Sequence, residues 1–131
     1  VTVFNRTRDR AAALVERFGA GDRVRVGSGE GTPEEFDLVV QATSVGMSGG
    51  PAPESNPLEL LGMSASSILA SGPVVYETVY TPVETPLVRA AREAGASVVT
   101  GLDLFFEQAA DQFRAWTGEA LPEEARSSFA N

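Results

Sequence analysis

Two arginines follow a short apolar run at the start of the chain. The residues from Val1 to Phe4 are β-branched, aromatic or small, which predicts a buried strand, and Asn5-Arg6-Thr7 comes directly after it, with Arg10 one helical turn further on. At such a strand end in a dinucleotide-binding sheet, an acidic residue binds a ribose 2′-hydroxyl, whereas Arg accommodates a 2′-phosphate. Two guanidinium groups can hold a phosphate by bidentate hydrogen bonds, so the pattern favours NADP over NAD. The alternative is a pair of solvated surface arginines.

Two more polar segments lie at the ends of expected strands. The third strand ends in Ala42, Thr43 and Ser44, whose small side chains allow a ligand to approach the backbone, and the hydroxyls of Thr43 and Ser44 can donate hydrogen bonds. The fourth strand ends in the segment that holds Thr78 and Tyr80, and the Tyr hydroxyl can bind a polar substrate. The alternatives are an ordinary exit from a strand into a loop, and a half-buried Tyr that only packs.

The start of the expected long helix is the fourth candidate. Gly101 permits a close turn there, and Leu104 and Gln108 are four residues apart, so they share one face of the helix. That face would combine an apolar contact with an amide that both donates and accepts hydrogen bonds. A solvated Gln side chain is the alternative.

Strands and helices alternate along the chain. The hydrophobic spacing predicts strands at 1–4, 24–26, 36–42, 74–80 and 97–100. It also predicts a first helix with Thr7 as its N-cap, and further helices over 58–61, 85–94, 102–116 and 121–129. In the first helix the apolar residues that recur at helical spacing, and that should face the core, are Ala11, Leu14, Val15 and Phe18. This alternation predicts an α/β fold with a doubly wound parallel sheet, in which the first strand is missing. Because residue 1 already lies in a strand, we expect the start to be a cut edge of a longer protein.

Composition narrows the possible functions. The 131 residues fit one domain, and the net charge of −8 disfavours a nucleic-acid or anionic-membrane surface. The chain has no Cys and no His, and its ten basic residues are all Arg, so we expect no disulfide and no metal site. No apolar run approaches the roughly 18 residues of a membrane span. Nothing in the sequence specifies an oligomeric state.

In order and spacing, these segments resemble the shikimate dehydrogenase family. That family shows a strand followed by Asn-Arg-Thr, an Asn-Ala-Thr-Ser-x-Gly-Met segment, an Asp-x-x-Tyr-x-Pro-x-x-Thr-Pro-Leu segment, and a Gly-x-x-Met-x-x-x-Gln-Ala helix ending near Trp-Thr-Gly. The corresponding segments here are 5–7, 41–47, 77–87 and 101–118, so the resemblance covers almost the whole chain. Three positions depart from the pattern: Gln41 replaces Asn, Glu77 replaces Asp and Leu104 replaces Met.

The resemblance implies an oxidoreductase that transfers hydride between NADPH and 3-dehydroshikimate to give shikimate, on the route to chorismate and the aromatic amino acids. Residues 1–131 would be a partial, Rossmann-like NADP-binding domain with C-terminal helices. They would lack the Gly-rich phosphate turn and the N-terminal domain, which carries the family's catalytic Lys–Asp pair. We therefore expect no catalytic residue in this chain, no activity from it alone, a small-molecule substrate as partner, and a cytoplasmic location.

The resemblance also assigns roles by position. Asn5, Arg6, Thr7 and Arg10 would hold the 2′-phosphate of NADP; Ala42, Thr43, Ser44 and Gly101 would line the cofactor; Thr78 and Leu104 would lie near the nicotinamide; and Tyr80 and Gln108 would reach the substrate. Two alternatives stay open. One is a stand-alone dinucleotide-fold module with a binding or regulatory role, suggested by the absence of His, Lys and Cys. The other is a sister enzyme that uses quinate or prefers NAD.

Overall fold

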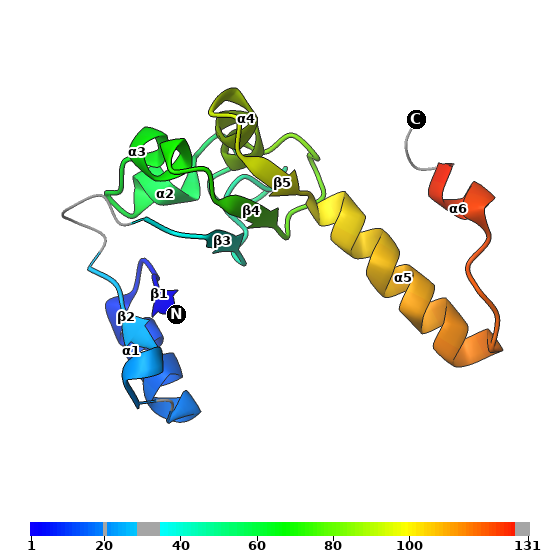
Figure 1. The fold of residues 1–131 in the computed structure, drawn as a ribbon, viewed down its shortest axis with the longest axis horizontal. Helices are drawn as coiled ribbons and strands as arrows, with labels where there is room; N and C mark the ends of the chain where they lie inside the picture. The colour runs from blue at the N-terminus through cyan, green and yellow to red at the C-terminus, as the bar shows by residue number, and fades with distance from the viewer. Residues whose placement is uncertain (20, 29–34, 128–131) are drawn as a thin grey trace.

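A computed structural model describes residues 1–19, 21–28 and 35–127 of the chain (Figure 1). Its first part contains β1 (Thr2–Val3), α1 (Arg8–Phe18), a short 3-10 helix (Gly21–Arg23) and β2 (Arg25–Val26). Its second part contains β3 (Leu38–Gln41), α2 (Pro57–Leu60), α3 (Ala65–Ala70), β4 (Val74–Glu77), α4 (Pro86–Glu93), β5 (Ser97–Val99), α5 (Gly101–Thr117) and α6 (Glu123–Ser127). The expected alternation of strands and helices is therefore confirmed.

The strands form two parallel sheets. β1 pairs with β2, and β3, β4 and β5 form a second sheet in that order, with Val39 opposite Val75 and Val75 opposite Val98. Among the described residues no strand pairing joins the two sheets, and Figure 1 shows them as separate units. Because the strands within each sheet run the same way, their carboxyl ends meet at one edge, where α/β folds bind their ligands. The predicted parallel α/β class is confirmed.

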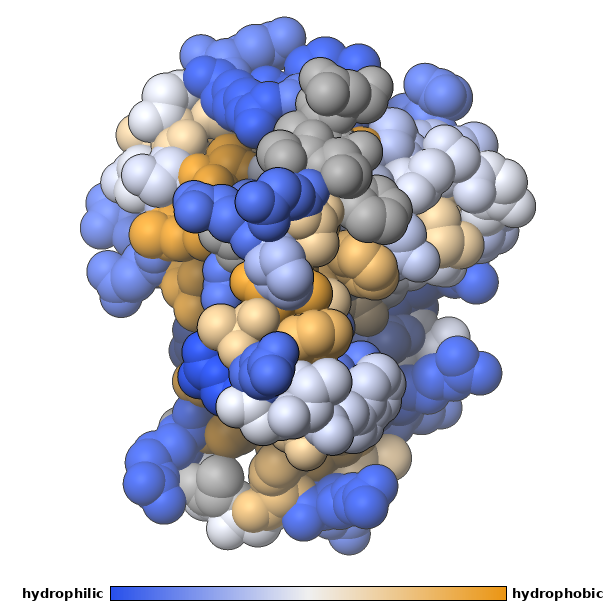
Figure 2. All heavy atoms as spheres, turned by 90° about the vertical axis from the view of Figure 1, so that its right-hand side faces the viewer, coloured by the Kyte–Doolittle hydropathy of each residue, from blue (hydrophilic) through white to orange (hydrophobic). Residues whose placement is uncertain are grey.

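The core lies on one face of the three-stranded sheet, under α2, α3 and α4 (Figure 1). Its buried members are Leu58, Ala65, Ile68, Leu69, Val75, Leu87 and Ala91. The side chains that alternate to the other face stay accessible, with Leu38 53% and Val40 54% exposed. The view in Figure 2, from the side toward which α5 runs, likewise shows hydrophobic residues exposed among hydrophilic ones. The packed half of the molecule is thus the half that supports the carboxyl ends of β3, β4 and β5.

The observed elements differ from the expected ones mainly at their ends. β4 stops at Glu77 rather than at Tyr80, because the Glu77 side chain accepts the backbone amide two residues further on and so takes it out of the strand pairing (Val79 N to Oε1, 2.9 Å). α3 was not expected at all. It is only one and a half turns long, too short to show a helical period, and it begins where the Ser64 hydroxyl accepts a hydrogen bond from Ser67 N at 3.3 Å. Residues 128 and 129 of the expected last helix lie outside the described residues.

The expected core stripe on α1 is wrong at two positions. Ala11 is buried, but Leu14 is 42% and Phe18 68% exposed. The reason is the size of the surface beneath the helix: α1 contacts β2, and β1 and β2 are each two residues long. A sheet of that size cannot cover four apolar side chains spread over two turns of helix.

The long helix α5 begins with a capping box. Thr100 Oγ1 accepts a hydrogen bond from Asp103 N (3.3 Å), and the Asp103 carboxylate accepts one from Thr100 N (3.0 Å). The helix ends at Gly118, whose φ of 77° lies in the left-handed region. Across the part of the chain that is described, no helix combines the length and the apolar character needed to cross a bilayer.

Removing the cap should cost measurable stability. We expect Thr100→Val to lower the free energy of unfolding by about 1 kcal/mol, because one amide at the helix start loses its hydroxyl acceptor. Urea denaturation of the full-length protein measures this change. Thr100→Ser is the matched control: it keeps the hydroxyl and should stay close to the unchanged protein. Equal losses in both variants would show that the hydrogen bond of the cap does not account for the loss.

Candidate functional site

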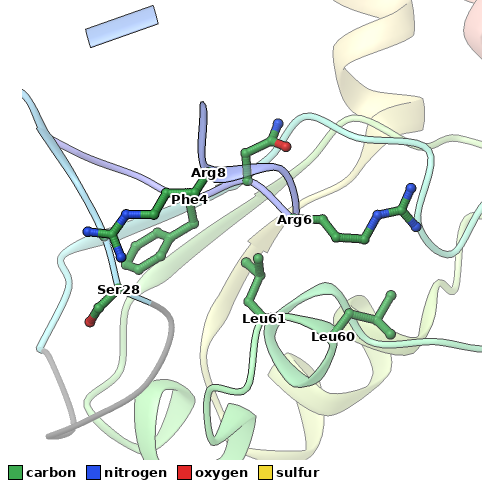
Figure 3. Close-up of a pocket in the computed structure, with 8 residues that line it drawn as sticks. Phe4, Arg6, Arg8, Ser28, Leu60 and Leu61 are labelled. Carbon is green, nitrogen blue, oxygen red and sulfur yellow. The ribbon is translucent and has the colours of Figure 1, made fainter. Parts of the chain in front are cut away.

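A pocket of about 200 Å³ opens at the carboxyl end of β1 (Figure 3). It is lined by the end of β1, the start of α1, the loop after β2 and the end of α2, through Phe4, Asn5, Arg6, Arg8, Gly27, Ser28, Leu60 and Leu61. Asn5 shapes the turn, since its Oδ1 accepts a hydrogen bond from Thr7 N at 2.8 Å. The pocket therefore has an apolar wall and two cationic side chains at its rim.

The structure brings some of the predicted phosphate-binding residues together at this pocket. Asn5 and Arg6 line the pocket, whereas Thr7 and Arg10 are not among its lining residues in the described part of the chain. Arg8, which the sequence pattern did not single out, lines it instead. Figure 3 shows the Arg6 and Arg8 side chains extending in opposite directions, so each guanidinium group covers a different side of the opening. The missed signal was the position of Arg8 at the first turn of α1.

The loop after β3 is held by the buried side chain of Gln41. Its Oε1 accepts hydrogen bonds from Thr43 N (3.2 Å) and Thr43 Oγ1 (3.0 Å), and its Nε2 donates to Val45 O at 3.0 Å. Ala42, Thr43 and Ser44 are all exposed. These predicted cofactor contacts thus lie on the surface at the carboxyl edge of the sheet, in a loop fixed by one buried amide.

Glu77, at the end of β4, has no exposed surface. Its Oε1 accepts a hydrogen bond from Val79 N (2.9 Å) and its Oε2 accepts one from Thr85 Oγ1 (2.8 Å). Burial raises the pKa of this carboxyl above its ordinary value, and hydrogen bonds from Val79, Thr85 and Thr78 act in the opposite direction. Burying a carboxylate costs desolvation free energy unless it is hydrogen-bonded, and here both of its oxygens accept hydrogen bonds.

Tyr80 and the start of α5 lie against each other. The Tyr80 ring packs on Phe105, with 5.4 Å between ring centroids, and Tyr80 remains 53% exposed. Gly101 is buried against the loop after β4, so closely that an added Cβ atom would lie 2.2 Å from Val79 O. Of the predicted helix residues, Gln108 is exposed and Leu104 partly buried. Tyr80 is therefore both packed and accessible. It combines the two interpretations of the sequence, a ring that packs and a hydroxyl that can reach a substrate.

Three predicted segments consequently meet at one edge of the three-stranded sheet. Thr78 N donates to Gln41 O at 3.1 Å, which joins the loops after β3 and β4, and Gly101 brings α5 against the second of them. Within residues 1–19, 21–28 and 35–127, no group of three or more acidic side chains is arranged to hold a metal ion. The arrangement offers the hydroxyl groups of Thr43, Ser44 and Tyr80 on exposed residues at this edge, which suits a polar ligand.

Two of three comparisons with known proteins found similar ones. No protein-family model matches the chain. It is 38% identical over 119 residues to the shikimate dehydrogenase (NADP(+)) of Lysinibacillus sphaericus, covering 91% of this chain and 40% of that enzyme. The chain therefore spans about two fifths of the length of the curated relatives that it matches.

Solved structures of two dehydrogenases are similar to this chain in fold and in sequence. A shikimate 5-dehydrogenase from Thermus thermophilus, in complex with NADP(H) and shikimate, matches 98% of this chain and 44% of its own length, with a TM-score of 0.75 and 33% identity. A quinate dehydrogenase from Corynebacterium glutamicum, in complex with NAD, matches 98% of this chain and 45% of its own length, with a TM-score of 0.74 and 27% identity. Sequence identity and fold thus extend over nearly the whole chain. The chain is therefore similar in sequence and fold to the C-terminal part of shikimate dehydrogenases.

Proposed function

We propose that the full-length protein is an NADP-dependent shikimate dehydrogenase, which transfers hydride between NADPH and 3-dehydroshikimate. The pocket beyond β1 carries this proposal: Arg6 and Arg8 line it, and no acidic side chain is among its lining residues in the described chain. An acidic residue at this strand end would suit the 2′-hydroxyl of NAD, whereas Arg suits the 2′-phosphate of NADP. A cytoplasmic location and a small-molecule substrate are part of the same proposal.

The lining of the pocket fits the adenosine end of NADP. Phe4, Leu60 and Leu61 supply apolar surface for a planar base, and the guanidinium groups of Arg6 and Arg8 supply charged donors for a phosphate. When bound, the cofactor supplies the hydride. The work of this chain is then to bind and orient: Asn5, Arg6, Thr7 and Arg10 remain the proposed phosphate-binding set, to which the geometry adds Arg8.

The edge formed by the loops after β3 and β4 is the proposed nicotinamide and substrate side. We assign cofactor contacts there to Ala42, Thr43, Ser44, Thr78, Gly101 and Leu104, and substrate contacts to Tyr80 and Gln108. The exposed part of Tyr80 can bring its hydroxyl to the substrate while Phe105 supports its ring. Because the chain has neither Lys nor His, we assign the proton transfer to the part of the enzyme that these residues do not cover.

Removing the Tyr80 hydroxyl tests the substrate assignment. In the full-length enzyme we expect Tyr80→Phe to raise the KM for 3-dehydroshikimate about 3- to 10-fold, which corresponds to one lost neutral hydrogen bond, and to leave the KM for NADPH unchanged. Steady-state kinetics at pH 7 measure both constants. The Phe ring can still pack on Phe105, so the thermal midpoint should not fall.

Tyr76→Phe is the matched control, because Tyr76 lies in β4 and has no proposed contact with the substrate. An unchanged KM in Tyr80→Phe would remove the assigned role. The similarity to a quinate dehydrogenase makes quinate oxidation with NAD the second candidate. Assays of the unchanged enzyme with both substrates and both cofactors decide between them: a kcat/KM for quinate and NAD above that for shikimate and NADP would replace the proposal.

A further inference from the structure

Neighbouring strands end in the same hydrogen-bonding device. Gln41 and Glu77 are the last residues of β3 and β4, they lie opposite each other in the strand register, and both are buried. Each side chain accepts a hydrogen bond from the backbone amide two residues further on, Thr43 N in one case and Val79 N in the other. In both places the side chain bends the chain out of the sheet and fixes the first residues of a loop.

Glu77 does more than Gln41, because its second oxygen reaches the far end of the same loop. Oε2 accepts a hydrogen bond from Thr85 Oγ1 at 2.8 Å, and that oxygen in turn accepts one from Val88 N at 3.2 Å, which caps α4. Thr85 is 1% exposed. One buried carboxylate thus links the end of β4 to the start of α4 and closes the segment 78–85 between them.

The closed segment has contacts on both of its sides. Ser48 N, from the loop after β3, donates to Thr81 O at 2.9 Å. On the other side Gly101 lies against the carbonyl of Val79, and Phe105 supports the ring of Tyr80. Tyr80 therefore stands on a loop whose two ends are held by Glu77 and whose sides are held by neighbouring elements.

We propose that Glu77 is a positioning residue for Tyr80: its carboxylate sets the shape of the segment 78–85 and thereby the place of the Tyr80 hydroxyl at the substrate. The proposal rests on the proposed substrate contact of Tyr80. A structural role alone would be filled better by an apolar side chain of similar size, since a buried carboxylate costs desolvation energy. A carboxylate is needed here because two donors, an amide and a hydroxyl, must be accepted in two directions.

The test compares KM values for two ligands in the full-length enzyme. Glu77→Gln keeps the size of the side chain but puts an amide nitrogen where one acceptor is needed, and we expect the KM for 3-dehydroshikimate to rise about 10-fold while the KM for NADPH changes less than about 2-fold. Thr85→Val breaks the same link from the other side. Because both variants remove one link, the double variant should be no worse than the poorer single variant. Glu77→Asp and Thr85→Ser, which keep the carboxylate and the hydroxyl, should recover most of the affinity.

A second readout does not need activity. Amide hydrogen exchange in the segment 78–88 should become faster in Glu77→Gln, while exchange in α5 stays as it is. Gly118→Ala, at the far end of α5 where φ is 77°, serves as a destabilised control that should leave both KM values unchanged. If the unchanged enzyme does not turn over 3-dehydroshikimate, the proposed function fails, and the exchange rates still decide whether Glu77 holds the loop. An unchanged substrate KM in Glu77→Gln, or additive losses in the double variant, would overturn the positioning role.

Discussion

Gly101→Ala in the full-length protein is expected to lower the free energy of unfolding by about 3 kcal/mol or more, at the upper end of the cost of overpacking. The added Cβ would lie 2.2 Å from Val79 O, 2.4 Å from Val79 C and 2.8 Å from Tyr80 N. These are backbone atoms, and the carboxylate of Glu77 holds the amide of Val79, so the loop cannot move away cheaply. Urea denaturation measures the loss.

The same substitution should impair the substrate side more than the cofactor pocket. If α5 and the loop are pushed apart, the Tyr80 ring loses its support on Phe105, and we expect the KM for 3-dehydroshikimate to rise about 10-fold or more. The control is Gly118→Ala at the other end of α5, where nothing lies within 4 Å of a Cβ and only the left-handed φ of 77° is strained. That strain costs about 1–2 kcal/mol. If Gly101→Ala lowers the free energy of unfolding no more than this control does, the close approach of Gly101 to the Val79 backbone does not limit the side chain at position 101.

The sequence predicted the class and order of the fold well where each element carried its own signal. α4 lies between Thr85 and Gly95 as expected, because a Thr cap, a Pro in the first turn and a terminal Gly all point to the same ends. The strand register could not be predicted, since it depends on which strands lie side by side. The exposure of Leu14 and Phe18 could not be predicted either, because helical spacing identifies an apolar stripe but not whether a large enough surface lies under it.

The sequence predicted which segments form the candidate site, but not how their side chains are arranged. The segments around Thr43, Thr78 and Gly101 do meet at one sheet edge, which follows from parallel strands whose carboxyl ends share that edge. The sequence did not reveal that Glu77 and Gln41 are buried supports. Polar residues next to expected ligand contacts look like further contacts, and only the direction of each side chain separates the two roles.

The cofactor assignment predicts a selective effect of Arg6. In the full-length enzyme we expect Arg6→Ala to raise the KM for NADP about 10- to 100-fold, the effect of losing charge-assisted hydrogen bonds, while the KM for NAD changes less than about 2-fold. The selectivity arises because the two cofactors differ only by the 2′-phosphate. Steady-state kinetics with each cofactor measure the ratio, and equal effects on both would remove the role of Arg6.

Reversing the charge should act more strongly than removing it. Arg6→Asp would repel the 2′-phosphate and could accept a hydrogen bond from a 2′-hydroxyl, so we expect the ratio of kcat/KM for NAD to that for NADP to rise about 1000-fold. Arg8→Asp makes the same change of charge in the same pocket, but its side chain extends in the opposite direction (Figure 3). A direct contact predicts a much larger shift for one arginine than for the other, whereas an effect of the overall field predicts similar shifts that both shrink as salt is added. The sequence pattern favours Arg6, but both arginines line the pocket, so the pair of variants identifies which guanidinium group recognises the phosphate.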